Sequence, residues 1–116
     1  MSEKIISLVR DFSRTPGARY RWQGNNSGEE FRERCVLPAL KDGNVRLVLD
    51  GAIALPPSFL DEVIGVMLEN RPELIPRLKI VLHDNPTAHD LLFDSLTRRI
   101  GLPKATTVFA PIEEAE

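Results

Sequence analysis

Four polar side chains stand where they could take part in chemistry. Asp50 and the pair His83 and Asp84 each follow a short apolar run of strand length, and Ser58 opens the apolar stretch between these runs. In an open α/β sheet, ligands gather outside the carboxyl ends of the strands. A serine, a histidine base and a carboxylate that orients the base are also the groups of a hydrolase. The sequence therefore predicts that Asp50, Ser58, His83 and Asp84 share one rim of a sheet.

The neighbours of Ser58 argue against a nucleophile. The glycine-flanked turn that exposes a nucleophilic serine is absent, since Pro57 and Phe59 stand on either side. Two other interpretations remain open. Ser58 could cap a helix, with Asp61 three residues on, and add about 1 kcal/mol of stability. It could instead carry a phosphate, which a helix N-terminus favours by about 0.3–1 kcal/mol, partly offset by the charge of Asp61.

The remaining polar groups predict neither a metal nor a cofactor. His83 and His89, with Asp84 and Asp90, match no strong metal-ligand spacing. The chain also lacks a glycine-rich loop followed by lysine that would cradle a nucleotide phosphate. We expect these side chains to be solvated residues of a loop and a helix.

Residues 19–22, Arg-Tyr-Arg-Trp, alternate basic and aromatic side chains. Such a mixture could stack single-stranded nucleic acid, but the chain has a formal net charge of -2 and no basic excess. The alternation is also typical of a half-exposed strand. We therefore expect a strand with Tyr20 and Trp22 on its inner face and Arg19 and Arg21 outside, and no nucleic-acid partner.

Helix caps predict where the helices begin. The string SGEE at 27–30 is a capping box, so a helix begins at Ser27, and Pro38 should kink or end it. A second helix should begin at Ser58. Asn85 followed by Pro86 is typical of a third helix start.

Strand-like runs alternate with these helices. Strands alternating with helices indicate a sheet with a parallel centre and right-handed crossovers. The predicted fold is an α/β domain with a mixed four- to five-stranded sheet packed with three helices. The predicted order is a strand at 5–12, a strand at 19–22, a helix from 27, a strand at 45–49, a helix from 58, a strand at 78–82, a helix at 86–100 and an edge strand at 106–109.

The totals bound the class of protein. A chain of 116 residues with 42% hydrophobic content fits one domain, which we place at 1–112, with an acidic tail at 113–116. The single cysteine, Cys35, cannot form an internal disulfide and is expected to be a small buried hydrophobe in a reducing compartment, most simply the cytoplasm. No apolar run approaches the roughly 20 residues of a membrane helix, so we expect no membrane association.

Several strings resemble one family. They are PGARY at 16–20, SGEEFRE at 27–33 with LP at 37–38, LDG at 49–51 and SFLDE at 58–62. In this order they are similar to an uncharacterised bacterial STAS-like domain family, over roughly the first two thirds of the chain.

The resemblance implies a binding role. STAS domains act as anti-sigma-factor antagonists and as cytosolic parts of anion transporters, where they bind partner proteins. Many antagonists are switched by phosphorylation of a serine at the start of the second helix, and the kinase is a histidine-kinase-like ATPase that is also the partner. By resemblance, Ser58 takes that position here, although Pro56 and Pro57 precede it where the antagonists typically carry an aspartate.

We therefore predict a regulatory protein-binding module rather than an enzyme. Its docking face should include Asp50, Ser58, Phe59, Asp61 and Glu62, and its partner could be an ATP-binding kinase. One alternative is a ligand-binding or hydrolytic domain that uses the strand-end rim. Another is a self-associating domain, a homodimer formed through the edge strand at 106–109.

Overall fold

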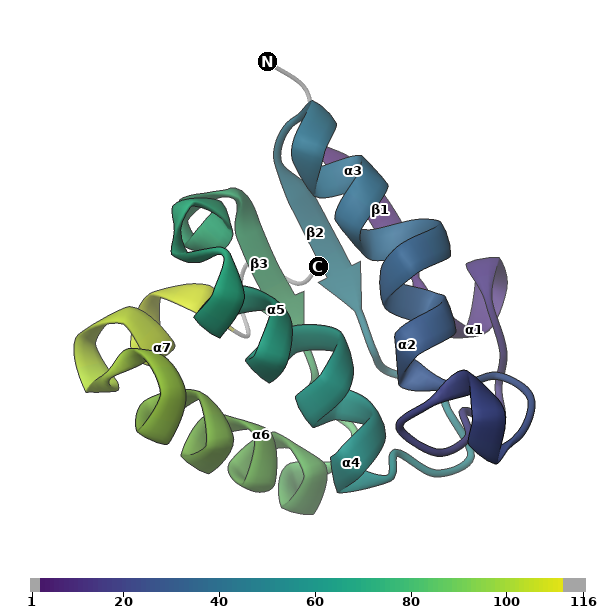
Figure 1. The fold of residues 1–116 in the computed structure, drawn as a ribbon. Helices are drawn as coiled ribbons and strands as arrows, with labels where there is room; N and C mark the ends of the chain where they lie inside the picture. Colours follow the sequence, from purple (N-terminus) through teal and green to yellow (C-terminus); the bar gives the residue numbers. More distant parts are fainter. Residues whose placement is uncertain (1–2, 112–116) are drawn as a thin grey trace.

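The computed structural model describes residues 3–111. Its centre is a parallel sheet of three strands, drawn as arrows in Figure 1. In spatial order the strands are β1 (Lys4–Ser7), β2 (Val45–Val48) and β3 (Leu78–Val81). Ile6, Leu47 and Ile80 align in one row across the sheet. The run at 45–49 thus supplies the central strand, as predicted, but the predicted mixed sheet of four to five strands is wrong.

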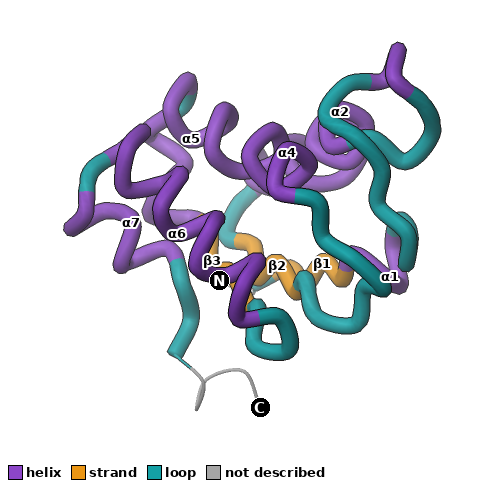
Figure 2. Tube along the Cα trace, turned by 90° about the horizontal axis from the view of Figure 1, so that it is seen from below, coloured by secondary structure: helices purple, strands orange, loops and turns teal. Residues whose placement is uncertain are grey.

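The long helices pack on one face of the sheet (Figures 1 and 2). The first consists of α2 (Gly28–Phe31), a π-helical turn (Arg32–Val36) and α3 (Leu37–Asp42); the second of α4 (Pro57–Leu60), a π-helical turn (Asp61–Gly65) and α5 (Val66–Asn70); the third is α6 (Pro86–Ile100). A short 3-10 helix (Pro72–Arg77) leads from α5 into β3. Because the strands are parallel, their carboxyl ends lie at the same end of the domain as the first turns of α4 and α6.

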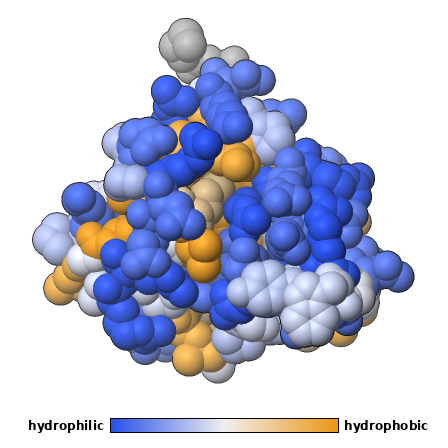
Figure 3. Space-filling model, viewed as in Figure 1, coloured by the Kyte–Doolittle hydropathy of each residue, from blue (hydrophilic) through white to orange (hydrophobic). Residues whose placement is uncertain are grey.

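The hydrophobic core fills the space between the helices and the sheet. Leu47 and Ile80 from the strands, and Leu49 just after β2, are fully buried there. Phe31 packs between two other rings, with centroids 4.8 Å from that of Phe12 and 6.0 Å from that of Phe59. The outer surface of the helical layer is mostly hydrophilic, with small hydrophobic patches between the helices (Figure 3).

Only the first part of the predicted strand at 5–12 is a strand, because β1 ends at Ser7. Ser7 caps a short helix, α1 (Leu8–Asp11), by accepting a hydrogen bond from the amide of Arg10 at 3.2 Å. A serine hydroxyl offers this bond where a strand would have to continue, so the chain turns into a helix at this residue.

Side chains from α1 close the free edge of β1. The Lys4 amide donates across to Asn44, so the alternate residues, Ile5 and Ser7, direct their backbone groups away from β2. The Ile5 carbonyl accepts from the Arg10 guanidinium at 2.9 Å, and the Ser7 amide donates to the Asp11 carboxylate at 2.8 Å. Charged side chains on an edge strand hinder pairing with another strand.

The predicted strand at 19–22 is wrong. These residues lie in a loop that contains a 3-10 helix (Arg21–Gln23), and they pair with no strand. Arg21 is exposed as predicted, but the predicted faces are wrong for Arg19, Tyr20 and Trp22. Trp22 is 80% exposed, whereas the Arg19 side chain reaches inward to two carboxylates.

The first long helix begins as predicted, but it passes through Pro38 and ends at Asp42. Ser27 accepts from the amide of Glu30 at 3.0 Å, and the helix stops before Gly43. The π-helical turn just before Pro38 widens the hydrogen-bonding interval, so that the Leu37 amide bonds to Arg32. We attribute the uninterrupted helix to this wider turn, which accommodates a residue that cannot donate.

The second and third helices differ in how well their starts were predicted. Asn85 caps α6 by accepting from the amide of Ala88 at 3.0 Å, and Pro86 is its first residue, as predicted. The second helix instead begins at Pro57, with Pro56 in the cap position and no side-chain cap. The N-cap interpretation of Ser58 is therefore wrong, because the fixed φ of proline suits the first helical position and the cap lies two residues earlier, at Pro56.

The predicted edge strand at 106–109 is a helix, α7 (Leu102–Val108). Phe109 alone forms an isolated parallel bridge with Ile80, and the Ala110 amide donates to the Ile80 carbonyl at 2.9 Å. A homodimer built on a strand at 106–109 therefore has no such strand to use. The predicted domain boundary at 112 and the acidic tail at 113–116 lie outside the described residues.

The two serines offer a matched test of capping. Ser27→Ala is expected to lower the free energy of unfolding by about 1 kcal/mol, because it removes the cap of α2. Ser58→Ala should change it by less than about 0.5 kcal/mol, because no cap bond is lost. Urea denaturation of both variants measures the difference, and equal losses would contradict this assignment of caps.

Candidate functional site

The ends of β2 and β3 are joined by carboxylates, and this brings three predicted rim residues together. Asp50 accepts from the amides of His83 and Asp84, at 2.6 and 3.0 Å. Asp84 in turn accepts from the amide of Gly51 at 2.8 Å. Gly51 has a φ of 96°, a conformation that suits glycine. Both carboxylates therefore organise the two loops of the rim.

Ser58 lies half-buried in the first turn of α4. Its hydroxyl has no hydrogen-bond partner among residues 3–111, so it is not paired with His83 there. A serine nucleophile requires a base within hydrogen-bond reach. The rim as built does not supply that pair.

The other residues of the predicted docking face point into the protein. Phe59 is fully buried and packs against Phe31. Glu62 is buried as well, and the Asp61 side chain is 15% exposed. Within this set, Asp50 and Ser58 are the residues that reach the surface, while the other three fix the position of the helix behind them.

Asp61 is the centre of a network of charges that the sequence did not predict. Arg99 from α6 contacts both of its carboxylate oxygens, each at 2.9 Å. Arg19 from the loop before α2 donates to Asp61 at 2.8 Å, and the Ser95 hydroxyl donates to it as well. Two guanidiniums thus share one carboxylate that is shielded from water.

Glu62 extends this network to the first long helix. Its carboxylate accepts from Arg32 and, at 3.3 Å, from Arg19. We call the set of Arg19, Arg32, Asp61, Glu62 and Arg99 the charge cluster. It ties the second long helix to the first helix, to α6 and to the loop before α2.

The hydrogen bonds of the charge cluster change the acidity of Asp61. Burial by itself would raise the pKa of this carboxyl, but hydrogen bonds from Arg99, Ser95 and Arg19 outweigh burial and lower the pKa from 3.8 to about 2. The same contacts raise the pKa of the Arg99 guanidinium. The Asp61 carboxyl is therefore fully ionised at neutral pH.

Local backbone features make room for the charge cluster. Arg32, Asp61 and Glu62 all lie in the two π-helical turns, which face each other. A Cβ on Gly65 would stand 2.7 Å from an Asp61 oxygen and 3.0 Å from the Arg99 side chain. The absence of a side chain at Gly65 thus lets Arg99 lie across the helix. The π-helical turns themselves are a feature that is frequent at functional sites.

The sequence carries only a partial signal for this cluster. It predicts Asp61 and Glu62 as site residues, but their partners are far away in the chain, with Arg19 and Arg99 separated from Asp61 by 42 and 38 residues. Arg99 has the sequence position of an ordinary basic residue near a helix end. No local spacing links these residues, so only the folded chain shows them together.

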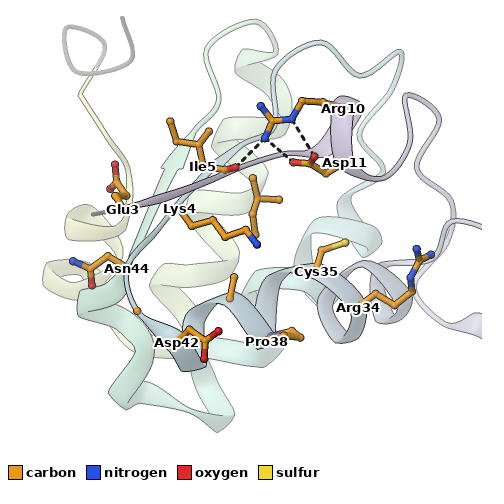
Figure 4. A pocket seen from close by; sticks show the side chains of 13 residues that line it. Glu3, Lys4, Ile5, Arg10, Asp11, Arg34, Cys35, Pro38, Asp42 and Asn44 are labelled. Carbon is orange, nitrogen blue, oxygen red and sulfur yellow. Dashed lines mark hydrogen bonds and ion pairs between the residues drawn. The ribbon is translucent and has the colours of Figure 1, made fainter. Parts of the chain in front are cut away.

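A hollow of the described surface lies elsewhere, between β1 and the first long helix. Its volume is about 510 Å³, and Figure 4 shows the Lys4 side chain extending across it toward the helix that carries Cys35. Cys35 is half-buried and packs against the core, and burial raises the pKa of its thiol. The thiol is therefore not activated, since reactive cysteines have a lowered pKa.

The histidines lie at a smaller hollow of about 300 Å³, between the end of β3 and the start of α6. His83, His89 and Asp90 line it, and the His89 ring packs on Phe109 with centroids 4.6 Å apart. Within residues 3–111 no group of three or more potential ligands is arranged to hold a metal ion. In the same range, no helix is long and apolar enough to cross a membrane.

Residues 27–88 match the family model described as STAS-like domain of unknown function (DUF4325). The matched segment is more than half of the chain and includes Arg32, Asp50, Ser58, Asp61 and Glu62. Neither a curated protein nor a solved structure matches the chain at a significant level. The family match and the alternation of parallel strands with helices agree, and the chain therefore belongs to this family of STAS-like domains.

Proposed function

We propose that this chain is a non-catalytic regulatory module that binds a partner protein at the carboxyl end of its sheet. We further propose that phosphorylation of Ser58 controls this binding. The observation that carries the proposal is the state of the Ser58 side chain. It is half-buried on the first turn of a long helix, and its hydroxyl has no cap bond or other hydrogen bond within residues 3–111.

The surroundings of Ser58 favour a phosphate. The first turn of a helix leaves backbone amides without intrahelical partners, and its dipole attracts negative charge. Asp61 lies one turn further on, but its charge is balanced by Arg99 and Arg19. The repulsion expected between a phosphate and Asp61 is therefore weaker than the sequence alone suggests.

The docking face consists of partly exposed groups on a rigid base. Asp50 and Ser58 provide the surface at the rim, and the charge cluster holds the helix behind Ser58 against its neighbours. By analogy with other STAS domains, the partner is an ATP-binding protein of the histidine-kinase-like class. A phosphate on Ser58 adds nearly two negative charges and would hinder docking on an acidic or apolar partner surface.

Intact-mass measurement of the chain purified from its native host tests the switch. We expect a species heavier by one phosphate, which is lost in Ser58→Ala. Ser13→Ala, a change at a half-buried serine in the loop after α1, should keep the modified species. If no phosphorylated species forms under any growth condition, the switch is ruled out.

Calorimetric titration with a purified histidine-kinase-like ATP-binding protein from the same host tests docking. The unmodified chain should bind, and Ser58→Glu should bind about tenfold more weakly, a difference of about 1.4 kcal/mol. Asp94→Asn, on the exposed side of α6, serves as the control. Absence of binding by the unmodified chain would contradict the proposed partner. Equal binding by Ser58→Glu would contradict the proposal that a negative charge at this position weakens docking.

A further inference from the structure

The loop at 16–26, which we call the aromatic loop, presents two stacked rings to solvent. Trp22 is 80% exposed and Tyr20 is 38% exposed. Their ring centroids are 6.3 Å apart and the planes differ by 16°. Large aromatic rings that stay in water mark sites of association, where tryptophan and tyrosine are the most enriched side chains.

The aromatic loop is ordered by many bonds, so the exposure of Trp22 is a fixed feature. The Gly17 amide donates to the Asn26 carbonyl at 2.7 Å, and the Arg21 amide donates to the Glu29 carboxylate at 2.9 Å. Arg19 is anchored in the charge cluster. A rigid loop loses little conformational entropy when its rings are buried in a contact, which favours binding.

The charges beside the rings disfavour nucleic acid as the partner. Arg21 forms an ion pair with Glu33 at 2.9 Å, and Arg19 is bound by Asp61 and Glu62. Binding to nucleic acid depends on cations that are free to pair with phosphates. Both guanidiniums of the aromatic loop have carboxylates beside them, so the loop carries no basic excess and its surface suits a polypeptide better than nucleic acid.

The same charges make the surface complementary to itself. Arg21 and Glu33 are both about half exposed, at 46% and 45%, and lie side by side next to the rings. In a two-fold dimer the same patch meets itself, so a patch with both signs places Arg21 of one copy opposite Glu33 of the other. The apolar rings then pack at the centre of the contact.

Association through the sheet is hindered at both edges. Arg10 and Asp11 occupy outward groups of β1, and Ala110 occupies the Ile80 carbonyl on β3. A second copy must therefore dock through side chains. We propose that the aromatic loop is the contact surface of a two-fold homodimer, with Trp22 and Tyr20 at its centre and Arg21 paired with Glu33 across the interface.

Sedimentation over a range of protein concentrations tests the dimer, and fluorescence reports on its centre, because Trp22 is the single tryptophan of the chain. The wild-type mass should rise to that of a dimer while the emission of Trp22 shifts to shorter wavelength. Trp22→Ala should weaken the dimer about tenfold or more. Ile53→Ala, at another exposed apolar residue, should leave it unchanged. A wild-type chain that stays monomeric with constant emission would overturn the proposal.

A charge exchange distinguishes contact across the interface from the ion pair within one copy. Arg21→Glu alone and Glu33→Arg alone should each be monomeric, because like charges then face each other. A mixture of the two variants should form a heterodimer, in which every facing pair again has opposite signs. A mixture that stays monomeric would contradict the two-fold arrangement. Quenching of Trp22 by an oligothymidylate in place of dimer formation would assign the aromatic loop to nucleic acid and also overturn the proposal.

Discussion

Replacing Asp61 by asparagine is expected to lower the free energy of unfolding by about 3 kcal/mol. The reason is that the carboxylate accepts from two guanidiniums and one hydroxyl in a place that water scarcely reaches. Removal of one member of a buried ion pair leaves the other charges without compensation, and this costs about 3–5 kcal/mol. We take the lower value because Arg19 and Arg99 remain partly exposed and can recover some solvation.

Urea denaturation at neutral pH measures this effect. Asp94→Asn is the matched control, since Asp94 is exposed on α6 and its loss should change stability by less than about 0.5 kcal/mol. If both variants unfold at the same urea concentration, Asp61 does not stabilise the fold in the way described.

Asp61 should also make the stability depend on pH in a defined direction. The pKa of this carboxyl is about 2 in the folded chain against 3.8 as its ordinary value. A group with a lowered pKa stabilises the folded state above its ordinary pKa and loses that contribution as the pH falls through the folded value. We expect about 2 kcal/mol to be lost between about pH 4 and pH 2. Asp61→Asn should lack this part of the acid transition.

Gly28→Ala is expected to destabilise the chain by about 2 kcal/mol. A Cβ at this position would lie 2.8 Å from the Phe59 carbonyl oxygen and 3.1 Å from the Glu62 Cβ. Both atoms belong to or adjoin the backbone of the facing helix, so the two helices would have to move apart, and overpacking of this kind costs about 1–3 kcal/mol. Alanine is favoured over glycine in a helix by about 1 kcal/mol, but the clash outweighs this gain.

The control for this substitution lies at the other end of the same helix. Gly43 has an extended φ of 165°, and a Cβ added to it would meet no atom within 4 Å. Gly43→Ala should therefore change the thermal midpoint only slightly, while Gly28→Ala should lower it by several degrees. A higher midpoint for Gly28→Ala would show that the helices can separate freely, against the close packing described.

Much of the fold could be predicted because local signals determine it. The caps at Ser27 and Asn85 depend on side chains three residues or fewer from their partners, and both are confirmed. The central strand follows from a short apolar run with buried alternate residues. All the residues that determine such a cap or strand lie within a few positions of one another, so the sequence alone is enough to predict it.

The wrong predictions arose where a contact distant in the sequence, or a second local signal, determined the structure. Alternation at 19–22 suggested a strand, but Arg19 is drawn inward by carboxylates more than 40 residues away. The β-branched residues at 106–108 suggested another strand. Pro103 is typical of a first helical turn, however, and the segment forms the helix α7. Pro57 similarly displaced Ser58 from the cap position.

The candidate site was also predicted in part. Asp50, His83 and Asp84 were placed together correctly because parallel strands bring their carboxyl ends to one edge. Phe59 and Glu62 were assigned to the surface, whereas they are buried. The amphipathic pattern of this helix is too broad to tell which side faces outward, because another helix packs on each flank.

The ion pair of Arg10 and Asp11 has a consequence for how the chain behaves at high concentration. An unpaired strand edge is a template on which further strands can be added, and repeated addition produces fibrils. In β1 the Ile5 carbonyl and the Ser7 amide already have partners from the chain itself. An incoming strand would first have to displace both side chains, so this small sheet is protected against fibril growth by two neighbouring residues.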